Sequence, residues 1–156
     1  MTTGTDRLAR PYRPRAQGGA ERFRATGPAA RAAITRVVDA LRPRGWTDDY
    51  LGSVEIVLAE IVNNVVEHAY HGQSPGFVGI RYSVGPRGLC LVVSDWGQGF
   101  SAGRLPPGAP MDFAVPPADL PEGGFGWLLI RSLAPNVRYR RDKGVNRLRV
   151  RFPLPD

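Results

Sequence analysis

Apolar residues recur at steps of three and four positions in two segments of the first half of the chain. The first segment follows Thr26, has Pro28 in its first turn and ends before Pro43, and the second follows Thr47 and runs to about Tyr70. Such steps place apolar side chains on one face of a helix, and proline suits the first turn of a helix. The pattern therefore predicts two amphipathic helices, each packed through one face.

Alternating apolar and polar positions predict strands in the second half of the chain. Phe77–Val84 and Leu89–Ser94 flank a Gly-Pro-Arg-Gly turn, and Val137–Arg141 precedes a second turn at residues 142–144. Short turns rich in glycine between two such runs are typical of antiparallel hairpins. The pattern therefore predicts two hairpins.

The last segment of the chain also alternates. Arg147, Arg149 and Arg151 point one way, and the apolar residues between them point the other way. We interpret these arginines as the solvated face of a sheet rather than as a nucleic-acid platform. A short strand near Ala20–Ala25 and a third helix beginning near Gly124 complete the set. Together the elements predict an α/β two-layer sandwich, with helices on one face of a mixed, mainly antiparallel sheet.

Two segments show no hydrophobic period. Residues 100–122 contain six prolines, and we interpret this segment as a lid over a ligand site, because long structureless loops in compact domains are usually functional. Residues 1–19 are rich in arginine, glycine and proline and are expected to form a disordered basic arm. The arm is either a solvated tail, which we favour, or a contact for nucleic acid or an acidic partner. Residues 20–156 are expected to form a single domain.

The composition excludes several classes of protein. The chain has 156 residues and a net charge of +7, and only one of its 21 basic residues is a lysine, Lys143. That lysine lies too near the C-terminus to act in a P-loop or as the strand lysine of a eukaryotic-type kinase. The single cysteine, Cys90, excludes a disulfide framework, and no apolar run is long enough to span a membrane. We therefore expect a cytoplasmic protein without a membrane partner.

Three polar residues follow one another at four-residue steps on the second predicted helix: Glu60, Asn64 and His68. Four-residue steps place them along one side of the helix. The amide oxygen of Asn64 suits Mg²⁺, which takes few protein ligands, and Glu60 could orient or deprotonate a nucleophile. An amphipathic helix with polar residues at its solvent edge explains this element at least as well. His68 either packs structurally or contacts the lid.

An apolar strand ends in an Asp-x-Gly-x-Gly motif formed by Asp95, Gly97 and Gly99. Glycines allow positive φ and close approach of backbone to a ligand. Asp95 has no basic neighbour in the sequence, and a buried carboxylate needs a donor, which the exocyclic amine of adenine would supply. An unpaired buried polar group costs about 1–3 kcal/mol, so guanine would be disfavoured about tenfold or more. A simple Asp-Gly turn is the alternative interpretation. It accounts well for one of the two glycines and less well for the second.

A glycine-rich turn opens the third predicted helix with Gly123, Gly124 and Gly126. Free N–H groups at a helix N-terminus bind phosphate. Three motifs thus stand in order: Glu-x-x-x-Asn-x-x-x-His-Ala-Tyr at 60–70, Asp-x-Gly-x-Gly at 95–99 and Gly-Gly-x-Gly at 123–126. They resemble the N, G1 and G2 boxes of the GHKL ATPase superfamily. The chain size and the His-Ala-Tyr ending narrow the resemblance to the bacterial anti-sigma factor serine/threonine kinases.

The resemblance covers residues 21–152 and implies a Bergerat-type ATP site. In such a site Asn64 would coordinate the Mg²⁺ that bridges the phosphates, and Glu60 would be the catalytic base. Gly124 and Gly126 would wrap the triphosphate at the hinge of the lid. The implied cofactors are therefore ATP and Mg²⁺.

The resemblance also implies an adenine pocket. Asp95 would hold the adenine amine, with Gly97 and Gly99 under the base. The family often places a threonine hydroxyl near the adenine, and here Asn146 could substitute for it as a polar contact. Where the family usually has a leucine-like residue after the last motif glycine, this chain has Trp127, which is expected to affect packing or the lid.

The resembled family phosphorylates a serine or threonine on a small STAS-type anti-anti-sigma protein and sequesters a sigma factor, usually as a homodimer. The resemblance therefore implies an ATP-dependent serine/threonine kinase that acts as an anti-sigma factor in a partner-switching system. The alternative is an ATP-gated partner-binding module without significant kinase turnover. A detached histidine kinase domain is disfavoured because the chain has no room for a helical dimerisation segment. Direct nucleic-acid binding is disfavoured because nothing resembles a recognition helix.

Overall fold

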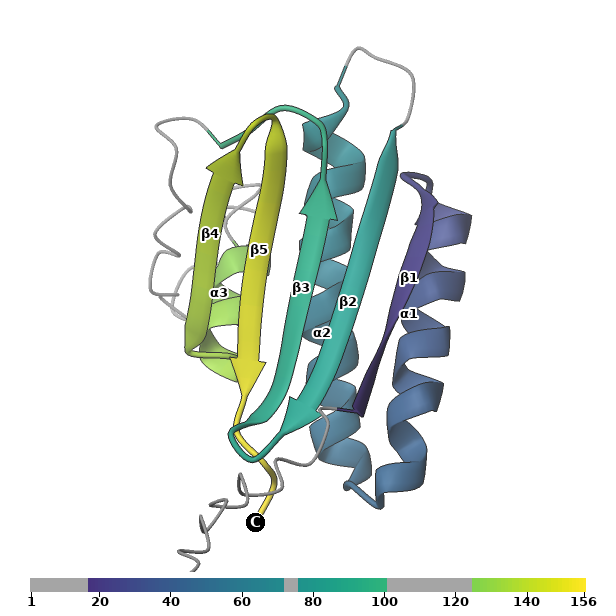
Figure 1. The fold of residues 1–156 in the computed structure, drawn as a ribbon, viewed down its shortest axis with the longest axis vertical. Coiled ribbons are helices and arrows are strands. Elements are labelled where there is room, and N and C mark those ends of the chain that lie inside the picture. Colours follow the sequence, from purple (N-terminus) through teal and green to yellow (C-terminus); the bar gives the residue numbers. More distant parts are fainter. Residues whose placement is uncertain (1–16, 72–75, 101–124) are drawn as a thin grey trace, which may run out of the picture.

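The computed structural model describes residues 17–71, 76–100 and 125–156, in which three α-helices lie on one face of a five-stranded sheet (Figure 1). In chain order the elements are β1 (Gln17–Arg24), α1 (Gly27–Leu41), η1 (Arg42–Arg44), α2 (Asp48–Asn64), η2 (Val65–Ala69), β2 (Phe77–Gly85), β3 (Gly88–Asp95), α3 (Phe125–Leu133), β4 (Asn136–Asp142) and β5 (Val145–Phe152). This architecture confirms the predicted α/β two-layer sandwich. The opposite face of the sheet carries no helix in the described part of the chain.

The strands have the order β1-β2-β3-β5-β4, and every neighbouring pair is antiparallel. The sheet was predicted to be mixed, and this part of the prediction is wrong, because no parallel pair occurs among the described strands. The connections explain this result. Two tight turns join β2 to β3 and β4 to β5, and the pair of helices between β1 and β2 returns the chain in the opposite sense.

Local sequence signals set the starts of the two long helices. The Thr26 hydroxyl accepts a hydrogen bond from the N–H of Ala29 (3.4 Å) at the start of α1. The Thr47 hydroxyl does the same for Tyr50 (3.2 Å) at the start of α2, as expected of N-cap residues. The apolar faces of both helices pack on the sheet. The fully buried side chains there include Val37, Leu41, Val54, Val57, Leu58, Val62, Val78, Ile80, Leu89 and Leu91.

The second helix does not continue as a regular α-helix to Tyr70. It changes after Asn64 into a π-helical turn, η2, and such turns are frequent at functional sites. The Tyr70 hydroxyl donates to the carbonyl of Phe77 (2.7 Å) and accepts from the N–H of Trp96 (2.9 Å). One side chain therefore ties the end of the helix to the start of β2 and to the end of β3.

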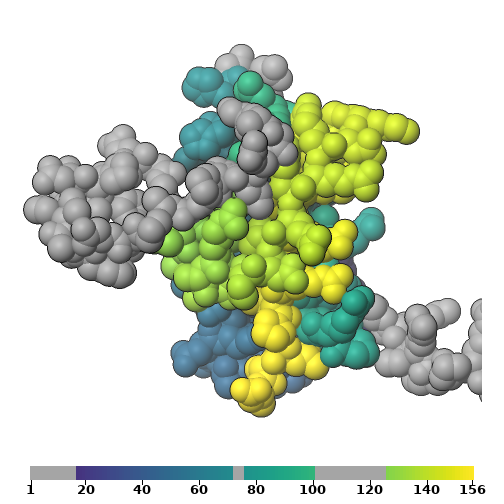
Figure 2. Space-filling model, turned by 90° about the vertical axis from the view of Figure 1, so that its left-hand side faces the viewer, coloured from purple at the N-terminus to yellow at the C-terminus, as the bar shows by residue number. Residues whose placement is uncertain are grey.

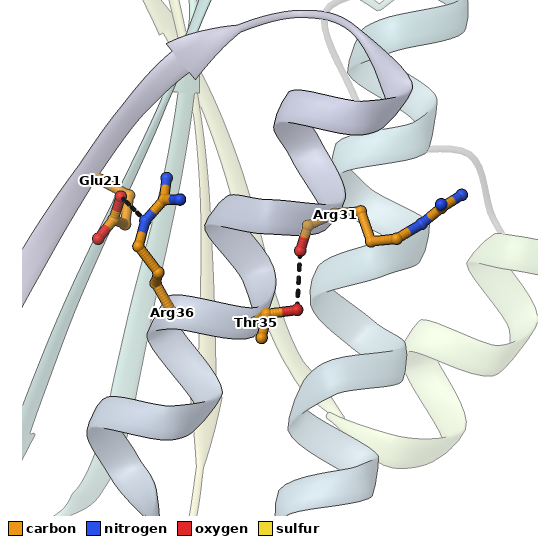
Figure 3. A network of polar contacts seen from close by, with 4 residues as sticks. All are labelled: Glu21, Arg31, Thr35 and Arg36. Carbon is orange, nitrogen blue, oxygen red and sulfur yellow. Dashed lines mark hydrogen bonds and ion pairs between the residues drawn. The ribbon is translucent and has the colours of Figure 1, made fainter.

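The first strand is longer than predicted. It begins at Gln17, so residues 17–19 belong to the sheet rather than to the expected basic arm. On the helix side of β1, the Arg36 guanidinium of α1 donates to the carboxylate of Glu21 at 2.9 Å (Figure 3). Residues 1–16 of the predicted arm, residues 101–122 of the predicted lid, and Gly124 lie outside the described residues.

The alternation predicted for the last strand is confirmed. Leu148, Val150 and Phe152 are buried, whereas Arg147 and Arg149 are exposed on the other face. Figure 2 views the molecule from the β4 edge, where α3 and the last two strands form the middle of the surface. In the described part of the chain, no helix combines the length and apolar character needed to cross a bilayer.

Candidate nucleotide-binding site

A cavity of about 460 Å³ lies between the C-terminal end of α2, the turn η2, the helix α3 and the ends of β3 and β5. Its volume falls in the range of sites that hold small molecules and cofactors. The cavity brings together four of the residues singled out in the sequence: Asn64, Asp95, Gly99 and Asn146. These residues come from two of the three motifs and from the last hairpin, so the fold brings them together around one cavity.

Asn64 forms part of the cavity wall at the last residue of α2. Its Nδ2 atom is buried and has no hydrogen-bond partner among the described residues. A buried amide nitrogen without a partner costs stability, so its retention favours a ligand-binding role. The N and O atoms of an amide are assigned by hydrogen bonding, so either atom of this group is available to a ligand.

Glu60 lies one helical turn before Asn64 and does not line the cavity. Its carboxylate lies instead against the N-terminal end of α3, where a Cβ atom on Gly126 would come within 2.6 Å of Oε2. The same Cβ would lie 4.0 Å from Nδ2 of Asn64. Gly126 therefore lies close to both Glu60 and Asn64. Any larger residue at position 126 would collide with the Glu60 carboxylate.

Asp95 is 6% exposed at the end of β3. Its Oδ1 atom accepts hydrogen bonds from the N–H of Gly97 (2.9 Å) and from Nδ2 of Asn146 (2.8 Å). No hydrogen bond to the other carboxylate oxygen occurs within the described residues, and the residue lines the cavity. The geometry therefore leaves one oxygen as an acceptor for a ligand donor.

Burial raises the pKa of Asp95 above its ordinary value of 3.8, against the opposing effects of Asn146, the Gly97 N–H and Arg141. Asp95 has no basic neighbour along the chain, but the fold provides one, because the β4–β5 hairpin brings Arg141 into electrostatic range. The net direction shows that desolvation outweighs the three favourable contacts. A buried acid with a perturbed pKa in a cavity is typical of a functional site.

Asn146 is 5% exposed and uses its whole carboxamide within the protein. Its Nδ2 donates to Asp95 and to the carbonyls of Gly97 and Gln98 (both 3.2 Å). Its Oδ1 accepts from the Tyr139 hydroxyl and from Nη1 of Arg141, both at 2.7 Å. The polar atoms expected to contact adenine are therefore engaged, and the geometry supports a role in positioning Asp95.

The structure tests one of the two reasons expected for the motif glycines, namely a positive φ. Neither Gly97 nor Gly99 adopts a positive φ. A Cβ atom on Gly97 would collide with the backbone carbonyl of Ala69 in η2, and that same carbonyl accepts the N–H of Gln98 at 2.6 Å. A Cβ on Gly99 would lie 2.9 Å from the side chain of Arg141. Gly97 is thus required by close approach of two protein segments.

Aromatic rings form one side of the cavity. Phe100 packs edge-on against Trp127 and Tyr139, with ring centroids 5.5 and 4.8 Å apart. Trp127 is buried in the core and lines the cavity, which agrees with the packing role expected of this departure from the family pattern. His68 also lines the cavity, but its side chain is 73% exposed and faces Glu67 at 3.7 Å.

Among the described residues, no group of three or more His, Cys, Asp or Glu side chains could hold a metal ion. An ion of the Mg²⁺ type does not need one, because it keeps several waters and is often held by one or two protein oxygens together with phosphates. The unpaired carboxamide of Asn64 in the cavity wall fits that requirement.

The comparisons with known proteins agree with this geometry. The family model described as "Histidine kinase-like ATPase domain" matches residues 23–152. The chain belongs to the histidine kinase-like ATPase family. Within it, the serine-protein kinase RsbW of Bacillus licheniformis is 30% identical over 109 residues, covering 69% of this chain and 68% of that protein. The RsbW of Halalkalibacterium halodurans is 34% identical over 102 residues, 65% of this chain.

The chain matches 62% of the length of the Halalkalibacterium kinase. The relatives place this ATPase-family chain in the anti-sigma kinase branch of the family. Two solved structures share its fold. The RsbU and RsbW domains of Rv1364c from Mycobacterium tuberculosis match 86% of this chain and 31% of that chain, with a TM-score of 0.59 at 18% identity. The histidine kinase domain of the blue-light activated kinase from Erythrobacter litoralis matches 79% of this chain and 60% of that one, with a TM-score of 0.51 at 20% identity.

Sequence reasoning missed two residues that shape the site of this ATPase-family member. Tyr139 and Arg141 hold Asn146, and Arg141 also donates to the carbonyl of Gly97 at 2.9 Å. A usable signal existed, because a hairpin register counted outward from the turn at 142–144 places Arg141 opposite Asn146. The next pairing, Asn146 opposite Asp95, needs the order of β3 and β5 in the sheet, which the sequence alone does not provide.

Proposed function

We propose that this chain is an ATP-dependent serine/threonine protein kinase that acts as an anti-sigma factor. The observation that carries the proposal is the convergence of a buried acid, Asp95, and an unpaired carboxamide, Asn64, on one cavity of about 460 Å³. Two such groups at different positions in one cavity suit a ligand with a donor at one end and charged oxygens at the other. An adenine nucleotide has both features.

In the proposed complex, the free carboxylate oxygen of Asp95 accepts the exocyclic amine of adenine. Support comes from its other oxygen, which is fixed by two hydrogen bonds, so the acid has a defined orientation before ligand arrives. Guanine would present a carbonyl to the same oxygen, and the unpaired contact would cost about 1–3 kcal/mol. The aromatic side of the cavity formed by Phe100 and Trp127 offers apolar surface to the base.

The phosphates are proposed to lie toward Asn64 and the N-terminal end of α3. Asn64 would hold Mg²⁺ together with the phosphates, and the ion would neutralise part of their charge. Gly126 is the glycine of this motif that lies within the described residues, and Gly124 is proposed to contribute its backbone N–H to the same phosphates. Gly99 is proposed to lie under the base, whereas Gly97 is proposed to fix the loop that carries it.

Glu60 is the proposed catalytic base. The substrate hydroxyl oxygen bonds to the γ-phosphorus, the bond from phosphorus to the bridging oxygen breaks, and ADP leaves. The hydroxyl proton moves to the Glu60 carboxylate, which lies against Gly126. Phosphoryl transfer depends on positioning and charge neutralisation more than on covalent chemistry, so this small set of groups is sufficient.

The proposed protein partners follow from the family. A STAS-type anti-anti-sigma protein is the proposed phosphoryl acceptor, and a sigma factor is the proposed sequestered partner. The proposal includes a homodimer in the cytoplasm. The similarity to RsbW serine-protein kinases supports this assignment.

One observation favours a second candidate, an ATP-gated partner-binding module without significant turnover. Glu60 lies against Gly126 and outside the cavity lining, so its carboxylate must reach the γ-phosphate from beside the cavity. The two candidates differ in one measurable quantity, the rate of phosphoryl transfer, while both require binding of ATP.

The test uses the full chain with Mg-ATP and each STAS protein encoded in the same genome. Calorimetry measures nucleotide affinity, and transfer of labelled γ-phosphate measures kinase activity. Glu60→Gln should abolish labelling and keep ATP affinity, whereas Glu55→Gln, an exposed acid on the same helix, should change neither. Asn64→Ala should weaken binding of Mg-ATP, and Asn63→Ala, which alters an exposed neighbour, should not.

The possible results separate the candidates. Labelling of a STAS serine or threonine that depends on Glu60 supports the kinase. Tight ATP binding with no labelling of any STAS protein, but with ATP-dependent capture of a sigma factor, supports the binding module. Absence of ATP binding contradicts both.

A further inference from the structure

The helix-free face of the sheet is strongly cationic. Six exposed arginines, which we call the cationic face, surround a shallow hollow of about 850 Å³ on this side of the molecule. Its members are Arg22, Arg81, Arg138, Arg140, Arg147 and Arg149. In Figure 1 this face of the sheet lies toward the viewer, with the helices behind it. The cavity of the candidate nucleotide site lies on the helix side, so the two surfaces are separate.

The strand register arranges the arginines in rows. In one row Arg81 of β2, Val92 of β3 and Arg149 of β5 lie side by side, and Arg138 of β4 follows. Arginines therefore flank β3 on both sides, with a small apolar residue between them. Two strand spacings separate Arg81 from Arg149, which is about 9.5 Å at the backbone.

The second row lies two residues along each strand, and here the position on β2 is a glycine, with the arginine on the outer strand β1. Gly79, Ser94 and Arg147 lie side by side, with Arg22 at one end and Arg140 at the other. The floor of the hollow is therefore made of small side chains on β2 and β3, and its walls are guanidinium groups. Figure 1 shows these strands as the middle of the sheet.

Carboxylates of the described residues do not balance the charges of the cationic face. Among the described residues, none of its six arginines forms an ion pair with a carboxylate. Glu21 stands at the rim, but its carboxylate is held on the helix side by Arg36, as Figure 3 shows. Asp142 is the other acidic residue that lines the hollow.

The arrangement also opposes stability. Arg149 lies directly opposite Arg138, and Arg147 lies directly opposite Arg140. Like charges directly opposite in an antiparallel pair are destabilising, whereas opposite charges would contribute roughly 0.2–1 kcal/mol per pair. A sheet face whose only requirement is solvation has no reason to place two like-charged pairs side by side. The cost favours a function for the positive charge.

We propose that the cationic face is a docking surface for an acidic amphipathic helix of a partner protein. A narrow apolar stripe of that helix would lie on Val92 and the neighbouring small residues, with rows of carboxylates facing the arginines on either side. A helix with its side chains is about 10–12 Å across, which matches the spacing of the flanking arginines. Arginine binds carboxylates with two parallel hydrogen bonds, so the chemistry of the walls fits such a partner.

The floor of the hollow disfavours nucleic acid. Single-stranded nucleic acid binds through aromatic rings on which bases stack, and Gly79, Val92 and Ser94 provide none. Two aromatic residues line the hollow outside this floor. Trp96 is 49% exposed at the end of β3, with the Arg22 guanidinium 5.8 Å from its ring, and the hydroxyl of Tyr139 is bonded to Asn146. A second copy of this chain is disfavoured because it would bring two positive surfaces together.

The test measures binding of a fluorescent synthetic helical peptide with one leucine stripe flanked by glutamates, by anisotropy with the full chain at low and raised salt. The comparison probes are the same peptide with glutamines and a single-stranded uridine RNA. Combined Arg147→Glu and Arg149→Glu should weaken peptide binding about tenfold or more. The same variant should unfold at an equal or higher temperature, because each new glutamate faces an arginine of β4.

A matched control carries the same change of charge elsewhere. Arg31→Glu with Arg87→Glu alters an exposed residue on α1 and one in the β2–β3 turn, and peptide affinity should stay close to that of the parent. Equal loss in this control would reduce the effect to net charge and overturn the proposal. Unchanged binding by the Arg147 and Arg149 variant would overturn it as well. Tighter binding of the RNA than of the acidic peptide, lost in that variant, would assign the surface to nucleic acid.

Discussion

The substitution Asp95→Asn separates recognition of the base from stability of the fold. Asparagine has the shape of aspartate, and its side-chain oxygen can keep both hydrogen bonds that Oδ1 accepts from Gly97 and Asn146. The other carboxylate oxygen, which accepts no hydrogen bond from the described residues, becomes an NH₂ group. The substitution therefore changes an acceptor into a donor at the position proposed to contact adenine.

The expected loss of affinity follows from one hydrogen bond. A hydrogen bond to a charged group contributes about 1.5–3 kcal/mol, and every 1.4 kcal/mol corresponds to a factor of ten. ATP affinity of Asp95→Asn should thus fall by about tenfold to a hundredfold. GTP should bind the variant more tightly than it binds the parent, because the new NH₂ group can donate to the guanine carbonyl.

The difference in stability between this variant and its parent should depend on pH in a defined direction. Burial raises the pKa of Asp95 above 3.8, so the folded state holds this proton more tightly than the unfolded state does. The stabilisation from the protonated acid is fully present below about pH 3.8 and is lost as the pH rises through the folded-state pKa. Relative to the parent, Asp95→Asn should therefore gain in free energy of unfolding as pH rises, and reach a constant advantage near neutrality.

Two measurements test this reasoning. Calorimetric titration with ATP and with GTP gives the ratio of affinities, and urea denaturation at several pH values gives the free energy of unfolding. An unchanged preference for ATP over GTP would refute the proposed contact between Asp95 and the base. A variant that is less stable than the parent at neutral pH would refute the account of the buried charge.

Three further substitutions test other parts of the site. Gly97→Ala should lower the free energy of unfolding by about 2 kcal/mol or more in urea, because its Cβ collides with the backbone of η2, while Gly52→Ala in open space on α2 should raise it by about 0.5–1 kcal/mol. Equal stability of the two variants would contradict the close approach. Asn146→Leu should cost about 1–3 kcal/mol and weaken ATP binding in calorimetry, because the adenine-facing acid and two hairpin donors lose their partner. Gly126→Ala should slow phosphoryl transfer about tenfold or more in single-turnover assays with little change in ATP affinity, since the new methyl group displaces Glu60; an unaltered rate would argue against that displacement.

The parts of the fold that depend on short-range signals could be predicted from the sequence. Thr26 and Thr47 cap helices whose apolar steps lie within the helix itself, and the alternation of β5 follows from neighbouring residues. The shared side of the helix occupied by Glu60 and Asn64 likewise follows from a four-residue step. Each of these predictions required only interactions between residues close in the chain.

The rest depended on contacts between distant segments. The π-helical turn after Asn64 is not visible in the pattern, because an apolar stripe continues through it. The hydrogen bond from Asn146 to Asp95 joins residues 51 positions apart and requires the order of strands in the sheet. The reason for Gly97 is similar, since its neighbour is a carbonyl of η2 rather than a ligand. Sequence reasoning selected these residues but could not assign their contacts.

The two hydrogen bonds of the Tyr70 hydroxyl, to the carbonyl of Phe77 and from the N–H of Trp96, have a consequence for how the site chooses its ligand. They hold the helical wall that bears Asn64 at a set separation from the strand end that bears Asp95. The length of molecule that can bridge both groups is therefore established when the chain folds, and little ordering remains for the moment of binding. Tyr70→Phe would keep the ring but remove both hydrogen bonds, so the separation between Asn64 and Asp95 would no longer be fixed. Ligands of different lengths should then bind more weakly than the preferred ligand binds the parent, and with affinities closer to one another.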